Sequence, residues 1–99
     1  MAASRRQVRL TPLAESDLED IWRYTSSNWS VDQADRYHRD LLSTIGALAR
    51  GLKTGRICSV RAGYWRYTAG SHVIFYRDTD HTLDVIRILH QRMDVDRHL

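Results

Sequence analysis

Residues 64–90 read YWRYTAGSHVIFYRDTDHTLDVIRILH, and this stretch decides the fold. It contains three runs rich in β-branched and aromatic residues, the composition typical of β-strands: 64–69, 72–77 and 82–90. Gly70 and Ser71 separate the first two runs and suit a tight hairpin turn, whereas 78–81 suits a longer one. Apolar residues occupy successive positions of the second run, so we expect a central strand covered on both faces.

Alternation within the third run predicts which side chains share a face. Ile86 and Ile88 are expected on one face of that strand, and Arg87 is expected on the other face between Val85 and Leu89. The strand would then present one purely apolar face to a core.

Two helices are predicted before these strands. Thr11 and Pro12 suit an N-cap and the first helical position, and Ser30 with Gln33 forms a capping box for a second helix. Gly51 to Gly55 should end the second helix. Only a short connection separates the first helix from the Ser30 cap of the second, which predicts an antiparallel helical hairpin. Residues at helical spacing form one face of each helix: Ala14, Leu18, Ile21, Trp22 and Thr25, then Ala34, Tyr37, Leu41, Ile45, Leu48 and Leu52.

Strand patterns also flank the helices, at 7–10 and at 56–61. The chain therefore predicts an α+β fold of the order β-α-α-β-β-β. An N-terminal strand would precede an antiparallel helical hairpin that packs on one face of a small antiparallel sheet. The length predicts a single domain over residues 1–99, with the uncovered sheet face and its rims left for function.

The charge is unusual in kind and in distribution. Of 15 basic residues only Lys53 is lysine, and the segment 50–77 holds six bases and no acid. A basic field of this kind favours acidic partners, protein or nucleic acid. The lone Cys58 excludes an intrachain disulfide and zinc sites built from cysteine pairs, and it suits the reducing cytoplasm. We recognise neither a signal peptide nor an apolar run long enough to span a membrane.

The C-terminal residues 90–99 form the densest polar cluster of the chain. Histidines and aspartates there could hold a metal or act as an acid/base pair, but a terminal segment lacks the rigid support that a metal site needs, so we predict no metal. His72 and His81 lie at predicted strand ends, where we expect them to be solvated. Sequence signatures of a serine nucleophile or a phosphate-binding glycine loop do not occur, and the sequence implies no cofactor.

Five segments together resemble the ParE toxins of type II toxin–antitoxin systems, within the wider RelE/ParE superfamily. The resemblance spans nearly the whole chain and is carried by Val8 to Pro12, Asp17 to Trp22, Gln33 to Tyr37, Gly70 to Arg77 and Arg87 to Asp94.

The resemblance implies a non-enzymatic poison of DNA gyrase. It also implies a ParD-like antitoxin with a ribbon-helix-helix domain, whose disordered tail folds onto the toxin, and protein partners in preference to direct nucleic-acid binding. Clustering and the resemblance predict His90, Arg92, Met93, Asp94 and Arg97 as the residues that bind the target. The antitoxin would bind those residues of the helical stripe that the core does not use: Leu18, Ile21, Trp22, Tyr37 and Leu41.

Two alternatives remain open on the sequence. A ribosome-dependent mRNA endoribonuclease of the RelE type would use Arg61, Arg66 and Arg77 with His90 as acid or base. A degenerate, non-toxic homologue would only bind an antitoxin. The second alternative arises because residues 50–61 of this chain contain no acid, whereas ParE toxins usually carry an Asn-Pro and an acidic pair in this segment.

Overall fold

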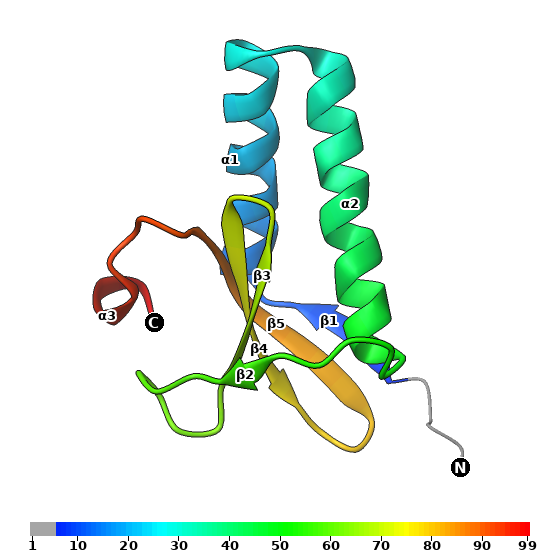
Figure 1. Cartoon of the computed structure of the whole chain (residues 1–99), viewed down its shortest axis with the longest axis vertical. Helices are drawn as coiled ribbons and strands as arrows, with labels where there is room; N and C mark the ends of the chain where they lie inside the picture. The colour runs from blue at the N-terminus through cyan, green and yellow to red at the C-terminus, as the bar shows by residue number, and fades with distance from the viewer. Residues whose placement is uncertain (1–5) are drawn as a thin grey trace.

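The computed structural model describes residues 6–99 and shows one sheet with a helical hairpin (Figure 1). Its elements are β1 (Gln7–Leu10), α1 (Pro12–Asn28), α2 (Val31–Ala49), β2 (Arg56–Ile57), β3 (Trp65–Ala69), β4 (His72–Asp78), β5 (Thr82–His90) and α3 (Val95–His98). In Figure 1 the hairpin of α1 and α2 rises above the sheet, and its tip extends well past the strands. The predicted α+β class and helical hairpin are confirmed.

The sheet has five strands in the order β1-β5-β4-β3-β2. The strands β2 to β5 pair in antiparallel fashion, whereas β1 pairs in parallel with the first half of β5. The predicted central strand is confirmed, because β4 lies in the middle and four of its residues in succession, 73–76, are buried.

Both helices begin where the capping residues predicted. The Thr11 Oγ1 accepts a hydrogen bond from Ala14 N at 3.0 Å, and the Ser30 Oγ accepts one from Gln33 N at 3.0 Å. Leu52, expected in the stripe of the second helix, lies beyond the end of α2 and is 70% exposed. The hairpin packs most of its remaining apolar stripe on one face of the sheet, over a buried core. That core contains Ala14, Leu18, Leu41, Ile45, Leu48, Ala49, Ile74, Tyr76, Leu83, Val85 and Ile88.

The opposite face of the sheet is also covered, which corrects the expectation that it would be open. Val73, Phe75 and Leu89 form a second buried cluster there with Cys58, and Tyr64, Val95 and Leu99 pack against it. The covering segments are the loop after β2 and the C-terminal α3. Apolar side chains in these two segments would otherwise lose the burial that favours folding.

The predicted strand over 56–61 is much shorter in the structure, where β2 contains only Arg56 and Ile57. Burial of Cys58, which is 2% exposed, draws the chain across the second cluster after Ile57. The rest of the predicted strand becomes a loop that returns to β3.

A β-bulge in β5 changes the predicted pattern of faces. Tyr76 pairs with Val85 and Phe75 pairs with Arg87, so Ile86 is the extra residue. Val85 consequently lies in the core under the helices, on the face that we expected Ile86 to share with Ile88. The Thr11 hydroxyl donates to Ile86 O at 2.7 Å, so the residue that caps α1 also satisfies the bulge.

Asp17 fixes α1 to the part of β5 that β1 does not reach. β1 pairs only with residues 82–85, and beyond them the Asp17 carboxylate accepts from Ile88 N at 2.9 Å. The same carboxylate forms a bidentate pair with Arg87, with Nε and Nη2 at 2.8 and 2.9 Å from its two oxygens. Both side chains are mostly buried, at 15% and 11% exposure, so this pair is far better shielded from solvent than a surface ion pair.

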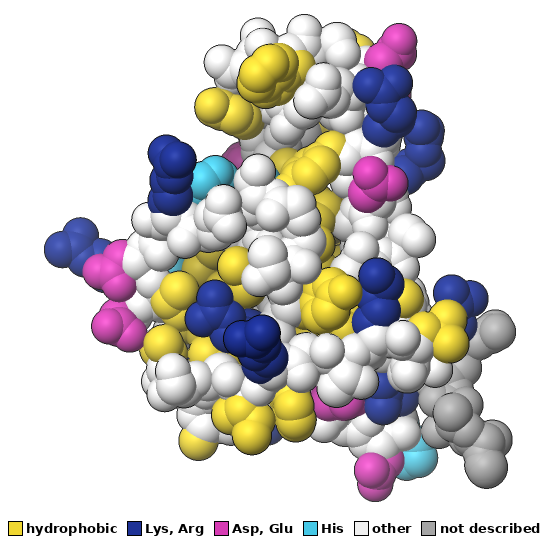
Figure 2. All heavy atoms as spheres, viewed as in Figure 1, with side chains coloured by type: hydrophobic (Ala, Val, Ile, Leu, Met, Phe, Trp, Pro, Cys, Tyr) yellow, Lys and Arg dark blue, Asp and Glu magenta, His cyan; other side chains and the backbone are white. Residues whose placement is uncertain are grey.

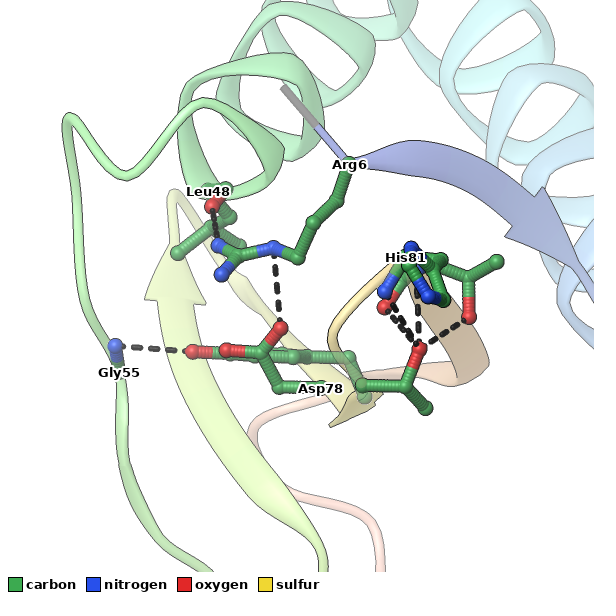
Figure 3. A network of polar contacts seen from close by, with 8 residues as sticks. Arg6, Leu48, Gly55, Asp78 and His81 are labelled. Atoms are coloured by element: carbon green, nitrogen blue, oxygen red, sulfur yellow. Dashed lines mark hydrogen bonds and ion pairs between the residues drawn. The ribbon is translucent and has the colours of Figure 1, made fainter. Parts of the chain in front are cut away.

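Arg6 and Gly55 hold the other end of the sheet together (Figure 3). Arg6 donates to Leu48 O at 2.7 Å and pairs with Asp78 at 3.0 Å, which joins the start of β1 to α2 and to the end of β4. Gly55 N donates to the Tyr76 hydroxyl at 2.9 Å. A Cβ on Gly55 would lie 2.4 Å from Arg66 O, so only glycine lets β2 approach β3 this closely.

Within residues 6–99, none of the helices is both long enough and apolar enough to cross a membrane.

We expect Asp17→Asn to reduce the free energy of unfolding by roughly 2–4 kcal/mol, because it leaves the shielded Arg87 guanidinium without a charged partner. Glu19→Gln is the matched control, since Glu19 forms only an exposed pair with Arg23 and its loss should cost about 0.5 kcal/mol or less. Urea unfolding followed by circular dichroism measures both. Equal losses in the two variants would contradict the role given to Asp17.

Two glycine substitutions should have opposite signs. Gly55→Ala should cost at least about 2 kcal/mol, because its Cβ would collide with the backbone of β3. Gly46→Ala lies inside α2 with open space around the new Cβ, and it should stabilise by up to about 1 kcal/mol through helix propensity. Thermal unfolding of both variants measures the two shifts, and a stable Gly55→Ala protein would contradict the close approach of β2 to β3.

Candidate binding surfaces

A groove of about 640 Å³ lies between the helical hairpin, the β3–β4 turn and the C-terminal segment. We call it the hairpin–tail groove. Its walls combine residues from four parts of the chain that are distant in sequence. They are Asp20, Ile21, Tyr24, Thr25, Trp29, Gln33, Tyr37, Ser71, His72, His90 and Met93.

Tyr37 closes the base of this groove by holding the β3–β4 turn. Its hydroxyl accepts from Ser71 N at 3.1 Å and lies 2.6 Å from His72 Nδ1. Gly70, with a positive φ of 60°, passes directly under the tyrosine ring, and a Cβ there would lie 2.8 Å from it. The turn therefore needs glycine both for its backbone conformation and for this contact.

His72 is half-buried rather than solvated, which corrects the expectation from the sequence. Its ring meets the His90 ring edge-on at 5.3 Å between centroids. Burial is the main cause that lowers the pKa of His72 to about 4, and the neighbouring His90 lowers it further. His72 is therefore neutral near pH 7, and in the wall of the groove its ring contacts the Tyr37 hydroxyl.

The C-terminal segment is fixed by its backbone while most of its side chains stay exposed. Gln91 N donates to Ser71 O at 3.0 Å, and Arg87 Nη1 donates to His98 O at 3.3 Å. Val95 and Leu99 anchor the segment on the second cluster. Met93, in contrast, is 46% exposed and lines the groove.

The predicted target-binding residues lie together on this segment. His90 is half-buried in the wall of the groove, and Arg92, Met93, Asp94 and Arg97 are exposed. Arg97 pairs with Asp94 at 3.6 Å across one turn of α3.

The predicted antitoxin-binding residues divide into two groups. Leu18 and Leu41 are 6% and 1% exposed and belong to the core under the helices. Ile21, Trp22 and Tyr37 are half-buried and remain accessible. Ile21 and Tyr37 line the hairpin–tail groove, so the structure brings them together with His90 and Met93.

Trp22 instead lines a second groove, of about 740 Å³, on the helical hairpin. Its Nε1 donates to Asp35 Oδ1 at 2.9 Å and so ties α1 to α2. Leu10, Leu18 and Leu42 supply the apolar part of this groove.

Two aromatic residues of the hairpin–tail groove were missing from the prediction. Tyr24 and Trp29 are 66% and 69% exposed near the tip of the hairpin, and both line the groove. For Tyr24 the available signal was its position off the apolar stripe of the first helix, which marks the ring as surplus to the core. Trp29 continues the spacing of that stripe, but it lies at the C-cap of α1, beyond the last helical residue, and nothing in the sequence indicated its exposure. Large exposed aromatic residues of this kind are typical of protein interfaces.

The arginines proposed for an endoribonuclease lie on the face of the sheet opposite the helices. Arg61 and Arg77 stack on the Tyr64 ring at 5.4 and 5.9 Å, and Arg66 stacks on Phe75 at 5.6 Å. His90 pairs with the first residue of β4, whereas Arg77 lies near its end, which is roughly 17 Å away at the usual rise per residue. The structure thus brings the arginines together but not His90 with them.

For metal binding, residues 6–99 show no group of three or more His, Cys, Asp or Glu side chains placed to hold an ion.

Comparison with known proteins gives concordant results. Residues 8–95 match the family described as the ParE toxin of type II toxin–antitoxin system, parDE. The chain is 50% identical to Toxin ParE1 of Mycobacterium tuberculosis, over 91% of this chain and 94% of that protein. It is 44% identical to Toxin ParE1 of Caulobacter vibrioides, over 92% and 95% of the two chains.

Solved structures show the same fold at low identity. A chain of the chromosomal ParDE TA system from P. aeruginosa superposes with a TM-score of 0.76 at 17% identity, covering 87% of this chain and 96% of that one. A chain of the toxin–antitoxin complex RelBE2 from Mycobacterium tuberculosis gives a TM-score of 0.65 at 23% identity, covering 90% and 94%. The RelE/ParE-like architecture and the family match over nearly the whole chain agree: the chain belongs to the ParE toxin family of type II toxin–antitoxin systems.

Proposed function

We propose that this chain is a toxin that inhibits DNA gyrase by binding it through the C-terminal segment, and that a ParD-like antitoxin with a ribbon-helix-helix domain neutralises it. The observation that carries the proposal is the match to ParE toxins over residues 8–95. A gyrase-directed toxin would act in the cytoplasm, where the lone Cys58 stays reduced.

The C-terminal segment is suited to binding another protein. Its backbone is fixed at Ser71 and at Arg87, so little conformational entropy is lost when a partner binds. It presents exposed arginine and methionine side chains, both enriched at protein interfaces. Arg92 and Met93 would make the central contacts, with His90, Asp94 and Arg97 around them.

The antitoxin would occupy the hairpin–tail groove. Ile21 and Tyr37 line it, and the exposed rings of Tyr24 and Trp29 extend its apolar wall. Because His90 and Met93 line the same groove, an antitoxin segment bound there would also cover part of the target-binding segment. Neutralisation would then be direct occlusion of the toxin surface.

The endoribonuclease alternative needs arginines and an acid or base around one phosphate. His90 lies at the far end of β4 from Arg77, which makes a non-catalytic toxin the better proposal. Toe-printing on translated mRNA distinguishes the two, because discrete cleavage in the ribosomal A site would favour the enzyme. Absence of growth arrest on expression would favour the non-toxic homologue.

We expect the chain to inhibit supercoiling by purified gyrase and to increase the amount of cleaved DNA. The double variant Arg92→Ala with Met93→Ala should lose at least about tenfold in inhibitory potency, because arginine and large side chains at an interface contribute strongly to binding energy. Arg39→Ala with Leu42→Ala is the matched control, an exposed arginine and an exposed apolar residue on α2. The control should keep its potency. Full inhibition by the tail variant would overturn the assignment of the target surface.

We expect Trp29→Ala to weaken binding of the proposed ribbon-helix-helix antitoxin by about tenfold or more, because a large exposed ring of the groove is lost. Leu13→Ala is the control, since Leu13 is 58% exposed on α1 but does not line the groove. Isothermal titration calorimetry on the purified proteins measures both affinities. Equal affinities in the two variants would place the antitoxin elsewhere.

A further inference from the structure

Tyr37 reaches from α2 to the β3–β4 turn, and its hydroxyl contacts three residues there. We infer that Tyr37 is a positioning residue of the toxin: its hydroxyl fixes the turn, and the turn fixes the segment that carries Arg92 and Met93. The inference rests on the proposed role of the C-terminal segment, and it adds to that role a residue from the helical hairpin.

The turn uses the full hydrogen-bonding capacity of the Tyr37 hydroxyl. This oxygen accepts from Ser71 N at 3.1 Å, and it lies 2.6 Å from His72 Nδ1 and 3.3 Å from Ala69 O. A phenol hydroxyl can donate one hydrogen bond and accept two. Donation to Ala69 O, with acceptance from Ser71 N and from a neutral His72 protonated at Nδ1, completes this set. Burial raises the pKa of Tyr37, so the hydroxyl keeps its proton near pH 7.

The same turn holds the start of the C-terminal segment. The ladder between β4 and β5 ends at the pair formed by His72 and His90, so Gln91 is the first residue beyond it. Gln91 N donates to Ser71 O at 3.0 Å, and the His72 and His90 rings meet edge-on at 5.3 Å between centroids. Ser71 and His72 therefore each contact Tyr37 on one side and the segment on the other.

His90 extends this arrangement to two of the target-binding residues. Its Nδ1 accepts from Arg92 N at 3.1 Å, and its carbonyl oxygen accepts from Met93 N at 2.9 Å. The side chains of Arg92 and Met93 are exposed, and Figure 2 shows charged side chains that project from the molecule on the side of this segment. The direction of such exposed side chains is set by the backbone of residues 90–93, which a continuous series of contacts connects to Tyr37.

The other anchors of the C-terminal segment act further along it. Arg87 binds the carbonyl oxygen of His98, and Val95 and Leu99 pack on the second cluster. These contacts leave residues 91–93 dependent on the turn for their position. If the turn loosened, these residues would have to become ordered when the target binds, and the lost conformational entropy would reduce the affinity.

The test is Tyr37→Phe in the full chain. The ring stays against Gly70 and only the hydroxyl is lost, and water can reach the exposed Ser71, so the fold should persist. We expect the amides of Gln91 and Arg92 to exchange hydrogen with solvent about fivefold faster or more, because the segment opens more often. The potency of gyrase inhibition should fall about fivefold or more, because the target then has to order the segment.

Tyr67→Phe is the matched control, since it removes the hydroxyl of another half-buried tyrosine, one that contacts Lys53 Nζ at 3.4 Å. Both the exchange rates and the potency should stay within about twofold in the control, because this hydroxyl makes one weak contact outside the turn. Thermal unfolding of both variants shows that they fold. Unchanged exchange at Gln91 and Arg92 in Tyr37→Phe, or faster exchange with full potency, would overturn the inference.

A combined variant separates positioning from a general loss of stability. Tyr37→Phe should cost less than about twofold in potency once Arg92→Ala and Met93→Ala have removed the side chains that it positions, because residues that act through one another are not additive. The same loss with and without the tail substitutions would mean that Tyr37 acts by another route, and would overturn the inference. If the unaltered chain did not inhibit gyrase, the proposed target would be wrong, and exchange at Gln91 and Arg92 alone would decide whether Tyr37 positions the segment.

Discussion

The carboxylate of Asp17 is the group on which the arrangement of this fold depends. It satisfies the Arg87 guanidinium through two hydrogen bonds and the Ile88 N–H through a third. Without it, the second half of β5 would have a buried charge without a partner and an unpaired backbone donor, because β1 ends at the residue opposite Val85. Docking α1 by its first turns leaves the tip of the hairpin free to stand away from the sheet, which creates the hairpin–tail groove.

Arg87 extends this anchor to the other side of the molecule. Two of its nitrogens bind α1, and the third donates to His98 O in the C-terminal segment. One side chain therefore couples the helical hairpin to the segment that covers the second cluster. Surfaces that the sequence suggested as separate, one for a target and one for an antitoxin, become neighbours because both are held by β5.

The features that the sequence predicted well are local ones. Thr11 and Ser30 cap helices through contacts three residues away, and the segment Gly51 to Gly55 separates the helices from the strands that follow. The features it missed depend on contacts between distant segments. The bulge at Ile86 is stabilised by Thr11, and the half-buried state of His72 requires Tyr37 above it and His90 beside it. A periodic pattern contains no information on such contacts.

The candidate sites were predictable to different degrees for the same reason. The C-terminal residues formed a cluster in sequence, and they remain a cluster in space because α3 is anchored at both Val95 and Leu99. The helical stripe could not be divided into core and surface by spacing alone. Leu18 and Ile21 lie within one turn of the same face, yet only the position of α1 over β5 decides that Leu18 is 6% exposed while Ile21 lines a groove.

The strong preference for arginine over lysine also finds its physical reason in the structure. A planar guanidinium can bind a carboxylate through two parallel bonds, as Arg87 and Arg9 do with Asp17 and Asp84. It can also sit over an aromatic ring, as the guanidinium carbons of Arg61 and Arg77 do at 5.4 and 5.9 Å from the centre of the Tyr64 ring. Lysine cannot form such a pair of parallel bonds, because its charge is a single flexible ammonium group. Arginine thus lets a domain of this size use the same residue type for its internal anchors and for contacts with aromatic rings at its surface.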